Sequence, residues 1–156
     1  MQPNDADNGT KPGPDEVLEA LEAYQERTLA VLDAHPRDPR GAVEGLVELH
    51  LRWVEEDPDR AKMVIAGRDA LAEGPLGERL ARSNGEMFDS MRSWLDDQVE
   101  SERLGNASLT LLHAIVFAPT HEVTRHWLGG RLPRPLADYE TALKAAAWAG
   151  ISSLSG

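Results

Sequence analysis

Residues 114–130 read AIVFAPTHEVTRHWLGG, and this stretch decides the fold class. It is long and mostly apolar, with one internal proline, and it ends in a Trp-Leu-Gly-Gly stop that is typical of a helix terminus. We expect the helix to run from about Asn106 to Leu128, with Gly129-Gly130 as a left-handed C-cap. Pro119 removes one backbone hydrogen bond, so a kink is predicted there.

The N-terminal part contains three helix starts. Pro14-Asp15-Glu16 opens the first helix, because proline and acidic residues are favoured in a first turn, and Pro36 ends it. Asp38-Pro39 and Asp57-Pro58 each combine an N-cap with a proline at the first helical position. These two signals predict the starts of the second and third helices.

The rest of the chain adds a fourth and a sixth helix. Gly74-Pro75 precedes the fourth, which we expect to end near Arg103-Leu104-Gly105. The sixth is predicted from Leu136 to about Ile151. No segment shows the period-two alternation of a strand. Six or so helices joined by short turns therefore predict an all-α fold, an antiparallel bundle.

Length and composition indicate one domain. The chain has 156 residues, enough to bury a real core. We expect residues 1–13 to be a disordered tail, residues 14–151 the helical domain and residues 152–156 a frayed tail. The absence of cysteine excludes disulfides and zinc–cysteine sites. No apolar run approaches the roughly 18 to 20 residues of a membrane span, and the N-terminus is too polar for a signal peptide, so we expect a cytoplasmic protein.

The net charge of −11 is the strongest compositional feature. Residues 1–60 hold 15 acidic and 6 basic side chains, whereas residues 61–156 hold 12 and 10. Phosphate backbones attract clustered Lys and Arg, so we expect no DNA binding by this chain alone. The less charged later part suits a protein–protein interface. Thirteen arginines against three lysines, with abundant Ala and Gly, indicate a GC-rich bacterial genome.

Known catalytic patterns are missing from the sequence. It has no Gly-x-Ser-x-Gly motif, no glycine-rich phosphate loop and no close pair of carboxylates in a plausible cleft. Residues 121–126, HEVTRH, superficially resemble a metalloprotease helix, but zinc needs histidines at i and i+4, and Arg125 stands at i+4. We therefore predict no enzyme activity, no catalytic residue, no metal site and no cofactor.

The order and spacing of several motifs resemble the regulatory domain of tetracycline-repressor (TetR) family transcription factors. Residues 114–130 resemble that family's penultimate helix, in which an apolar run and an Ala-Pro step precede a Glu-x-x-Arg-x-Trp-Leu-x-Gly tail. Residues 51–58, LRWVEEDP, are similar to the family's entry into a short helix, and residues 66–68 and 74–76 are also family-like. Residues 143–148 match the final helix with its Ala-Trp step, so the resemblance spans about residues 15–151.

The resemblance implies an effector-sensing and homodimerising domain. Family members carry an N-terminal helix-turn-helix, which we expect this chain to lack, because residues 11–18 resemble the segment that follows it. DNA would then be reached only through that missing domain. Two alternatives stay open. One is a stand-alone head-less protein that heterodimerises with and modulates a full-length regulator; the other is a small-molecule-binding helical protein unrelated to transcription.

Large, adaptable side chains at helical spacing form either plain core or a pocket between helices for a small hydrophobic effector. The resemblance implies a pocket in this region. Our candidates for its polar contacts are Arg68, Asn84 and His113. His113, Phe117 and His121 share one helix face, and these histidines have either a packing or interface role or a ligand or pH-sensing role. The candidate ligand-binding residues are His50, Trp53, Met63, Arg68, Asn84, Met87, Met91, Trp94, His113 and Phe117.

The last two helices carry more apolar surface than one buried stripe per helix requires, and such an excess marks an interface. We predict a two-fold homodimer in which both helices of each subunit form a four-helix bundle, with Glu122 and Arg125 toward its rim. The alternative is that both helices are buried within one subunit. The candidate interface residues are Ile115, Val116, Pro119, Glu122, Val123, Arg125, Trp127, Tyr139, Leu143 and Trp148.

Overall fold

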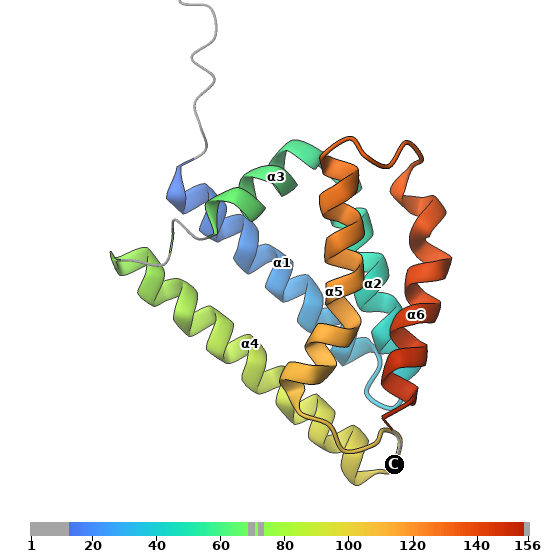
Figure 1. Ribbon diagram of the computed structural model, residues 1–156. Helices are drawn as coiled ribbons and strands as arrows, with labels where there is room; N and C mark the ends of the chain where they lie inside the picture. The colour runs from blue at the N-terminus through green and yellow to red at the C-terminus, as the bar shows by residue number, and fades with distance from the viewer. Residues whose placement is uncertain (1–12, 69–70, 72–73, 155–156) are drawn as a thin grey trace, which may run out of the picture.

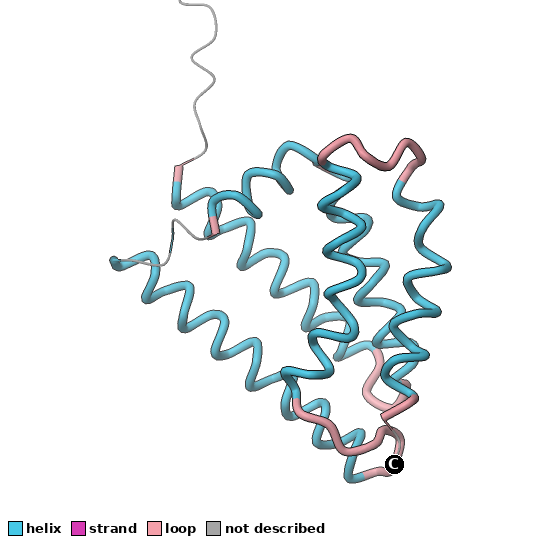
Figure 2. The backbone as a smooth tube through the Cα atoms, viewed as in Figure 1, coloured by secondary structure: helices cyan, strands magenta, loops and turns pink. Residues whose placement is uncertain are grey.

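The computed structural model describes residues 13–68, 71 and 74–154, and these residues form helices and loops without a strand (Figure 1, Figure 2). The predicted all-α fold is confirmed. The expected tail 1–13 lies, apart from Gly13, outside the described residues, as do Ser155 and Gly156. The helices are α1 (Pro14–Ala34), α2 (Pro39–Glu56), α3 (Pro58–Gly67), α4 (Gly74–Glu100), α5 (Leu109–Leu128), the short 3₁₀ helix η2 (Leu136–Tyr139) and α6 (Glu140–Ser152).

Local sequence signals fix most helix ends. The Asp38 carboxylate accepts a hydrogen bond from the backbone N–H of Gly41 at 2.9 Å, and Asp57 accepts one from Arg60 at 3.0 Å, so the predicted caps of α2 and α3 are confirmed. At the end of α5, Gly130 adopts a φ of 75°, and the N–H of Arg131 donates to the carbonyl of His126 at 2.9 Å. This arrangement is the predicted left-handed C-cap.

Three predicted boundaries are wrong by a few residues. Helix α5 begins at Leu109 rather than Asn106, because Ser108 is its N-cap and accepts from the N–H of Leu111 at 3.2 Å. Helix α4 ends at Glu100, ahead of the predicted stop, and Glu102 follows it with a φ of 59°. The predicted sixth helix is divided into η2 and α6, because Leu136–Tyr139 follows Pro135 as a 3₁₀ turn.

Helix α2 is the centre of the bundle, since it packs against α1, α3, α5 and α6. Helices α5 and α6 lie side by side over it (Figure 1). Their close approach depends on Gly150, because a Cβ at this position would come within 2.5 Å of Ile115 Cγ2. Only a residue without a side chain lets the two helices meet at this distance.

Helix α4 is held along α1 and diverges from α5 (Figure 1). Near its C-terminal end, the Trp94 indole donates to the carbonyl of His35 at 3.0 Å, and the Gln98 amide donates to that of Pro36 at 2.8 Å. Near its N-terminal end, Arg79 forms a two-pronged ion pair with Glu22 at 2.8 Å. Helix α4 is therefore attached to α1 and the α1–α2 turn, while its contact with α5 is small.

The buried apolar residues form two clusters. The larger one joins α1, α2, α4, α5 and α6 and includes Val47, Val54 and Val116, each without exposed surface. The smaller one joins the start of α1, helix α3 and the start of α4 around Val17, Leu18, Leu21, Val64, Leu71 and Leu80. Trp53 packs against both clusters and lies between them.

Among the described residues, none of the helices is both long and apolar enough to span a bilayer.

Candidate ligand-binding cavity

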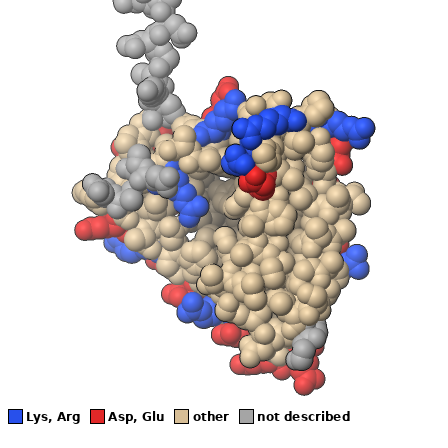
Figure 3. Space-filling view, viewed as in Figure 1, with Lys and Arg blue, Asp and Glu red and all other residues tan. Residues whose placement is uncertain are grey.

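A cavity of about 370 Å³ lies between the two clusters, at the small end of the size range of ligand sites. Residues from five helices, α1 to α5, line it, and none from α6 does. Its position follows from the fold, because α4 is attached to α1 and so cannot also close against α5. Figure 3 shows a hollow at this place on the surface, with both basic and acidic side chains close to its rim.

The structure brings most of the predicted ligand-binding residues together. Eight of the ten line this one cavity: His50, Trp53, Arg68, Asn84, Met87, Met91, His113 and Phe117. Their role in ligand binding stays a prediction. Met63 and Trp94 lie elsewhere. Met63 packs against the smaller cluster, and the indole of Trp94 points to the α1–α2 turn.

Sequence reasoning missed most of the polar wall that α1 and the end of α5 provide. Tyr24, Gln25 and Thr28 of α1 line the cavity, as does Thr124 of α5. His121, for which a ligand role was one of two alternatives, also lines it. Tyr24 and Thr28 occupy the apolar stripe of α1, four residues apart, although both side chains are polar. A polar group at a buried helix position needs a partner, so this pair was the available signal.

His50 is the centre of a hydrogen-bonded chain across the cavity wall. Its Nδ1 lies 2.9 Å from the Tyr24 hydroxyl, and its Nε2 lies 3.2 Å from Thr124 Oγ1. The only proton of the Thr124 hydroxyl goes to the carbonyl of His121 at 2.9 Å, so Thr124 accepts from His50 Nε2–H. His50 Nδ1 then accepts from Tyr24. The chain fixes one neutral tautomer of His50.

Burial keeps the interior of the cavity uncharged. Burial, together with the smaller effect of the charge of a protonated His121, lowers the pKa of His50 from 6.5 to about 3. The pKa of His121 falls to about 4, mainly through burial of its ring, although the residue as a whole is exposed at the rim. Burial also raises the pKa of the Tyr24 hydroxyl. At neutral pH these three side chains are therefore neutral hydrogen-bonding groups.

A row of rings follows one face of α5. The centroids of His113 and Phe117 are 4.7 Å apart, and those of Phe117 and His121 are 5.6 Å apart. The predicted shared face of these three residues is confirmed. The ring of His50 continues the row, with its centroid 4.6 Å from that of His121. Neighbouring rings in the row are tilted by 36° to 51° relative to one another, and together they form an uncharged aromatic wall of the cavity.

On the opposite side, the Gln25 amide donates to Asn84 Oδ1 at 2.6 Å. This bond joins α1 to α4. Gln25 and Met87 also line a second, more open groove between α1 and α4. These two side chains therefore separate the groove from the cavity and close the cavity on the side of α4.

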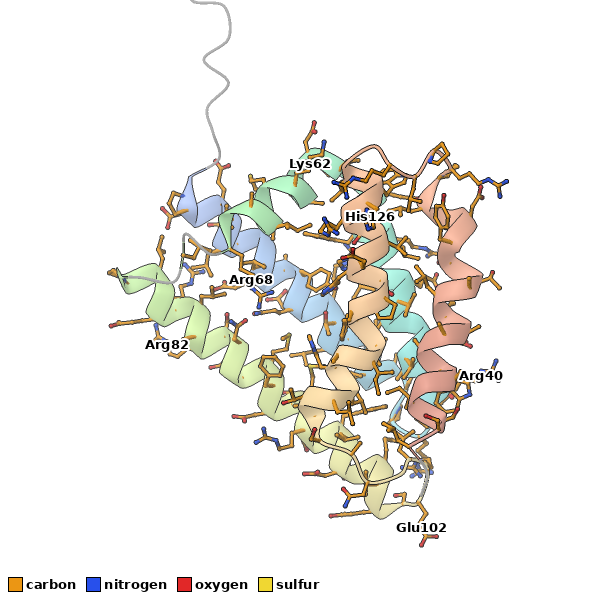
Figure 4. All side chains as sticks on the ribbon, viewed as in Figure 1. Arg40, Lys62, Arg68, Arg82, Glu102 and His126 are labelled. Carbon is orange, nitrogen blue, oxygen red and sulfur yellow. The ribbon has the colours of Figure 1, made fainter. Side chains whose placement is uncertain are left out.

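Positive charge gathers at the mouth. Arg68 and Arg125 line the cavity, whereas none of the described lining residues is Asp or Glu. Arg125 forms an ion pair with Glu122, and this hydrogen bonding lowers the pKa of Glu122 to about 2. Arg68, at the end of α3, forms no ion pair with any described residue. Figure 4 shows its side chain directed toward the space between α4 and α5.

The cavity presents aromatic rings, polar side chains and, among the described residues, one arginine without an ion pair. Within the described part of the chain, no three His, Asp or Glu side chains gather closely enough to hold a metal ion. The hydroxyls of Tyr24, Thr28 and Thr124 are all engaged in the bonds of the wall or of α1.

The predicted dimer residues divide into three groups. The assignment of Val116 and Leu143 to an interface is wrong, because both are buried within the core, with exposed fractions of 0% and 8%. Five are partly buried against that core: Ile115, Val123, Trp127, Tyr139 and Trp148. Pro119, Glu122 and Arg125 are exposed. Arg125, predicted at a dimer rim, lies instead at the cavity mouth.

The outward faces of α5 and α6 carry small and apolar side chains. Residues 109–121 and 145–154 contain no Asp, Glu, Lys or Arg. The exposed residues there include Leu111, Ala114, Ala118, Ala145, Ala146 and Ala149. Figure 3 shows a broad surface over α5 and α6 without charged side chains, bordered by charge at its edges. We call this the α5–α6 face.

No known protein-family profile matches the chain, and no curated protein sequence is significantly similar to it.

Proposed function

We propose that residues 14–151 are the effector-binding and homodimerising domain of a TetR-type regulator, with the cavity as effector site. The cavity carries the proposal. It is open to the surface, it has a volume of about 370 Å³, and side chains from five helices converge on it. These are the usual properties of a small-molecule site.

The distribution of buried polar groups supports the same conclusion. Six polar residues are buried in the described chain, and four of them line the cavity: Gln25, Thr28, His50 and Thr124. Each forms a hydrogen bond that holds its side chain in place. Apolar walls with a few oriented polar groups are the usual composition of a small-molecule site.

A thermal-shift screen across small apolar and amphipathic compounds tests the proposal. A compound that binds only the folded state raises the unfolding temperature in proportion to its excess over Kd. Met87→Trp, which adds volume on the cavity wall, should abolish the shift. Ala81→Trp adds a ring at an exposed site of the same helix and should leave the shift unchanged. If hits raise the unfolding temperature of Met87→Trp as much as that of the wild type, the cavity is not their site.

Dimerisation through the α5–α6 face is the second part of the proposal. The chain has a net charge of −11, so two copies repel each other except where the facing surfaces are uncharged. The α5–α6 face meets that condition, and its alanines allow helices of two subunits to approach closely. A two-fold axis through it would form a four-helix bundle.

Light scattering at micromolar concentration tests the dimer. We expect twice the chain mass of 17.1 kDa. Ala146→Glu places a charge in the middle of the face and should give a monomer, whereas Ala30→Glu, on the exposed side of α1, should leave the dimer intact. A wild-type mass of 17.1 kDa excludes the dimer at that concentration.

In a regulator of this type, effector binding in the bundle would change the relative orientation of two attached DNA-binding domains. Helix α5 is placed for such coupling, because its inner face lines the cavity and its outer face belongs to the α5–α6 face. We propose that this effector binding takes place in the bacterial cytoplasm, where such regulators act.

A further inference from the structure

The charges around the cavity narrow the class of ligand. Acidic residues outnumber basic ones 27 to 16 in the chain, yet the described lining residues include two arginines and no carboxylate. The Arg125 charge is compensated by Glu122. Among the described residues, Arg68 is therefore the lining cation that forms no ion pair.

The positive charge of Arg68 acts on side chains inside the cavity. After burial, which is the main cause, the charge of Arg68 is a further reason that the pKa values of His113 and His121 are lowered. Arg68 lines the same cavity as these rings. The described lining residues include two arginines and no carboxylate, so the lining itself carries positive charge.

The shape and chemistry of the wall define the other end of the ligand. The rings of His113, Phe117 and His121 offer uncharged aromatic surface, with successive rings tilted by 36° to 37°, and Met87, Met91 and Trp53 line the cavity with them. An aromatic ligand can stack on one of these rings and contact its neighbour at an angle.

We infer that the cavity binds a planar aromatic carboxylate, with its ring system along the His113–Phe117–His121 row and its carboxylate on Arg68. This inference rests on the proposed effector site and names its ligand class. Because Arg68 is exposed, the carboxylate stays close to solvent, and its desolvation is small. Arginine suits this role, since its planar fork binds a carboxylate through two parallel hydrogen bonds.

Three probes of nearly equal size test the inference: 2-naphthoate, 2-naphthamide and 2-(aminomethyl)naphthalene, which are anionic, neutral and cationic at neutral pH. Isothermal titration calorimetry with the wild-type chain should rank them in that order. Arg68→Gln should weaken the binding of 2-naphthoate about tenfold, which corresponds to roughly 1.4 kcal/mol, and should leave the affinity for 2-naphthamide unchanged. Arg92→Gln removes the same charge from an exposed site of α4 outside the cavity and should change neither.

The outcomes separate this inference from the proposed function. If all three probes bind equally well and compete with one another, the effector site stands and the preference for anions is wrong. If 2-naphthoate is preferred but Arg68→Gln binds it as well as the wild type does, Arg68 is not the anion contact. If no probe binds at millimolar concentration, the inference is wrong, and the thermal-shift screen alone decides the proposed function.

Discussion

The two sides of the bundle differ in how closely their side chains are packed. Where α2, α5 and α6 meet, aliphatic side chains are fully buried, and Gly150 lets two helices approach so closely that one added carbon atom would collide with Ile115. Where α1, α3 and α4 meet α5, the chain leaves a cavity and surrounds it with hydrogen-bonded polar groups. We call these the packed side and the open side.

The two sides also differ in where buried polar groups lie. Four of the six buried polar residues of the described chain line the cavity, and their hydrogen bonds orient them.

The largest expected difference concerns truncation of large side chains. Leu46→Ala, in the larger cluster, should lower the free energy of unfolding by about 2 to 5 kcal/mol, because it creates a cavity in a close-packed core. Met87→Ala, half-buried on the open side, should lower it by less than about 1 kcal/mol, because its side chain already borders open space. Urea unfolding followed by circular dichroism measures both. Equal losses at the two positions would contradict the division into two sides.

The pH dependence of stability tests the open side. The folded pKa of His50 is about 3 against an ordinary 6.5, so between these values the unfolded chain takes up a proton that the folded chain does not. Stability due to this group is complete above pH 6.5 and falls as the pH decreases, by roughly 1.4 kcal/mol per pH unit down to about pH 3. The free energy of unfolding, measured against pH, should have a smaller slope in His50→Gln than in the wild type. The difference between the two slopes isolates the contribution of His50 from that of the carboxylates. Parallel slopes between pH 6 and pH 4 would show that His50 is not buried as described.

A smaller effect is expected from the contact between α5 and α6. Gly150→Ala gains about 1 kcal/mol of helix propensity but forces the new Cβ against Ile115, at a cost of about 1 to 3 kcal/mol. The net result should be a loss of roughly 1 kcal/mol. In the Ile115→Ala background the same substitution should stabilise the protein, and a double-mutant cycle from urea unfolding gives the coupling. No coupling would mean that the two helices do not approach this closely.

The smallest effect concerns the one buried polar group without a partner. Thr120 Oγ1 is the only buried side-chain nitrogen or oxygen among the described residues that forms no hydrogen bond. It does not line the cavity. Thr120→Val should therefore stabilise the protein by up to about 1 kcal/mol, whereas Thr124→Val should destabilise it by removing a bond to His50. A loss of stability in Thr120→Val would reveal a partner for its hydroxyl.

The sequence predicted the features that depend on local chemistry. Asp38 and Asp57 cap their helices with their own neighbours, and Gly130 closes α5, so each could be read from a few adjacent residues. The division between η2 and α6, at Tyr139 and Glu140, was missed because apolar spacing continues through both helices without interruption.

The cavity depends on how distant helices are oriented, which local patterns do not record. Met63 and Met87 are alike in sequence terms, but the position of α3 turns one toward the smaller cluster and that of α4 turns the other toward the cavity. Similarly, Trp94 was predicted to line the ligand site with Met87 and Met91, yet its indole donates a hydrogen bond to a backbone carbonyl in the α1–α2 turn. The polar residues of α1 had no obvious partner until α2 and α4 were placed against them.

A crystal structure of the protein with 2-naphthoate tests the central claim most directly, because it locates the ligand. We expect density for one molecule between α1, α4 and α5, with its ring system against His113 and Phe117 and its carboxylate within hydrogen-bonding distance of Arg68. Helix α4 should remain apart from α5, held by Arg79 and Trp94. A structure in which α4 has closed against α5 and the ligand lies elsewhere would contradict the account.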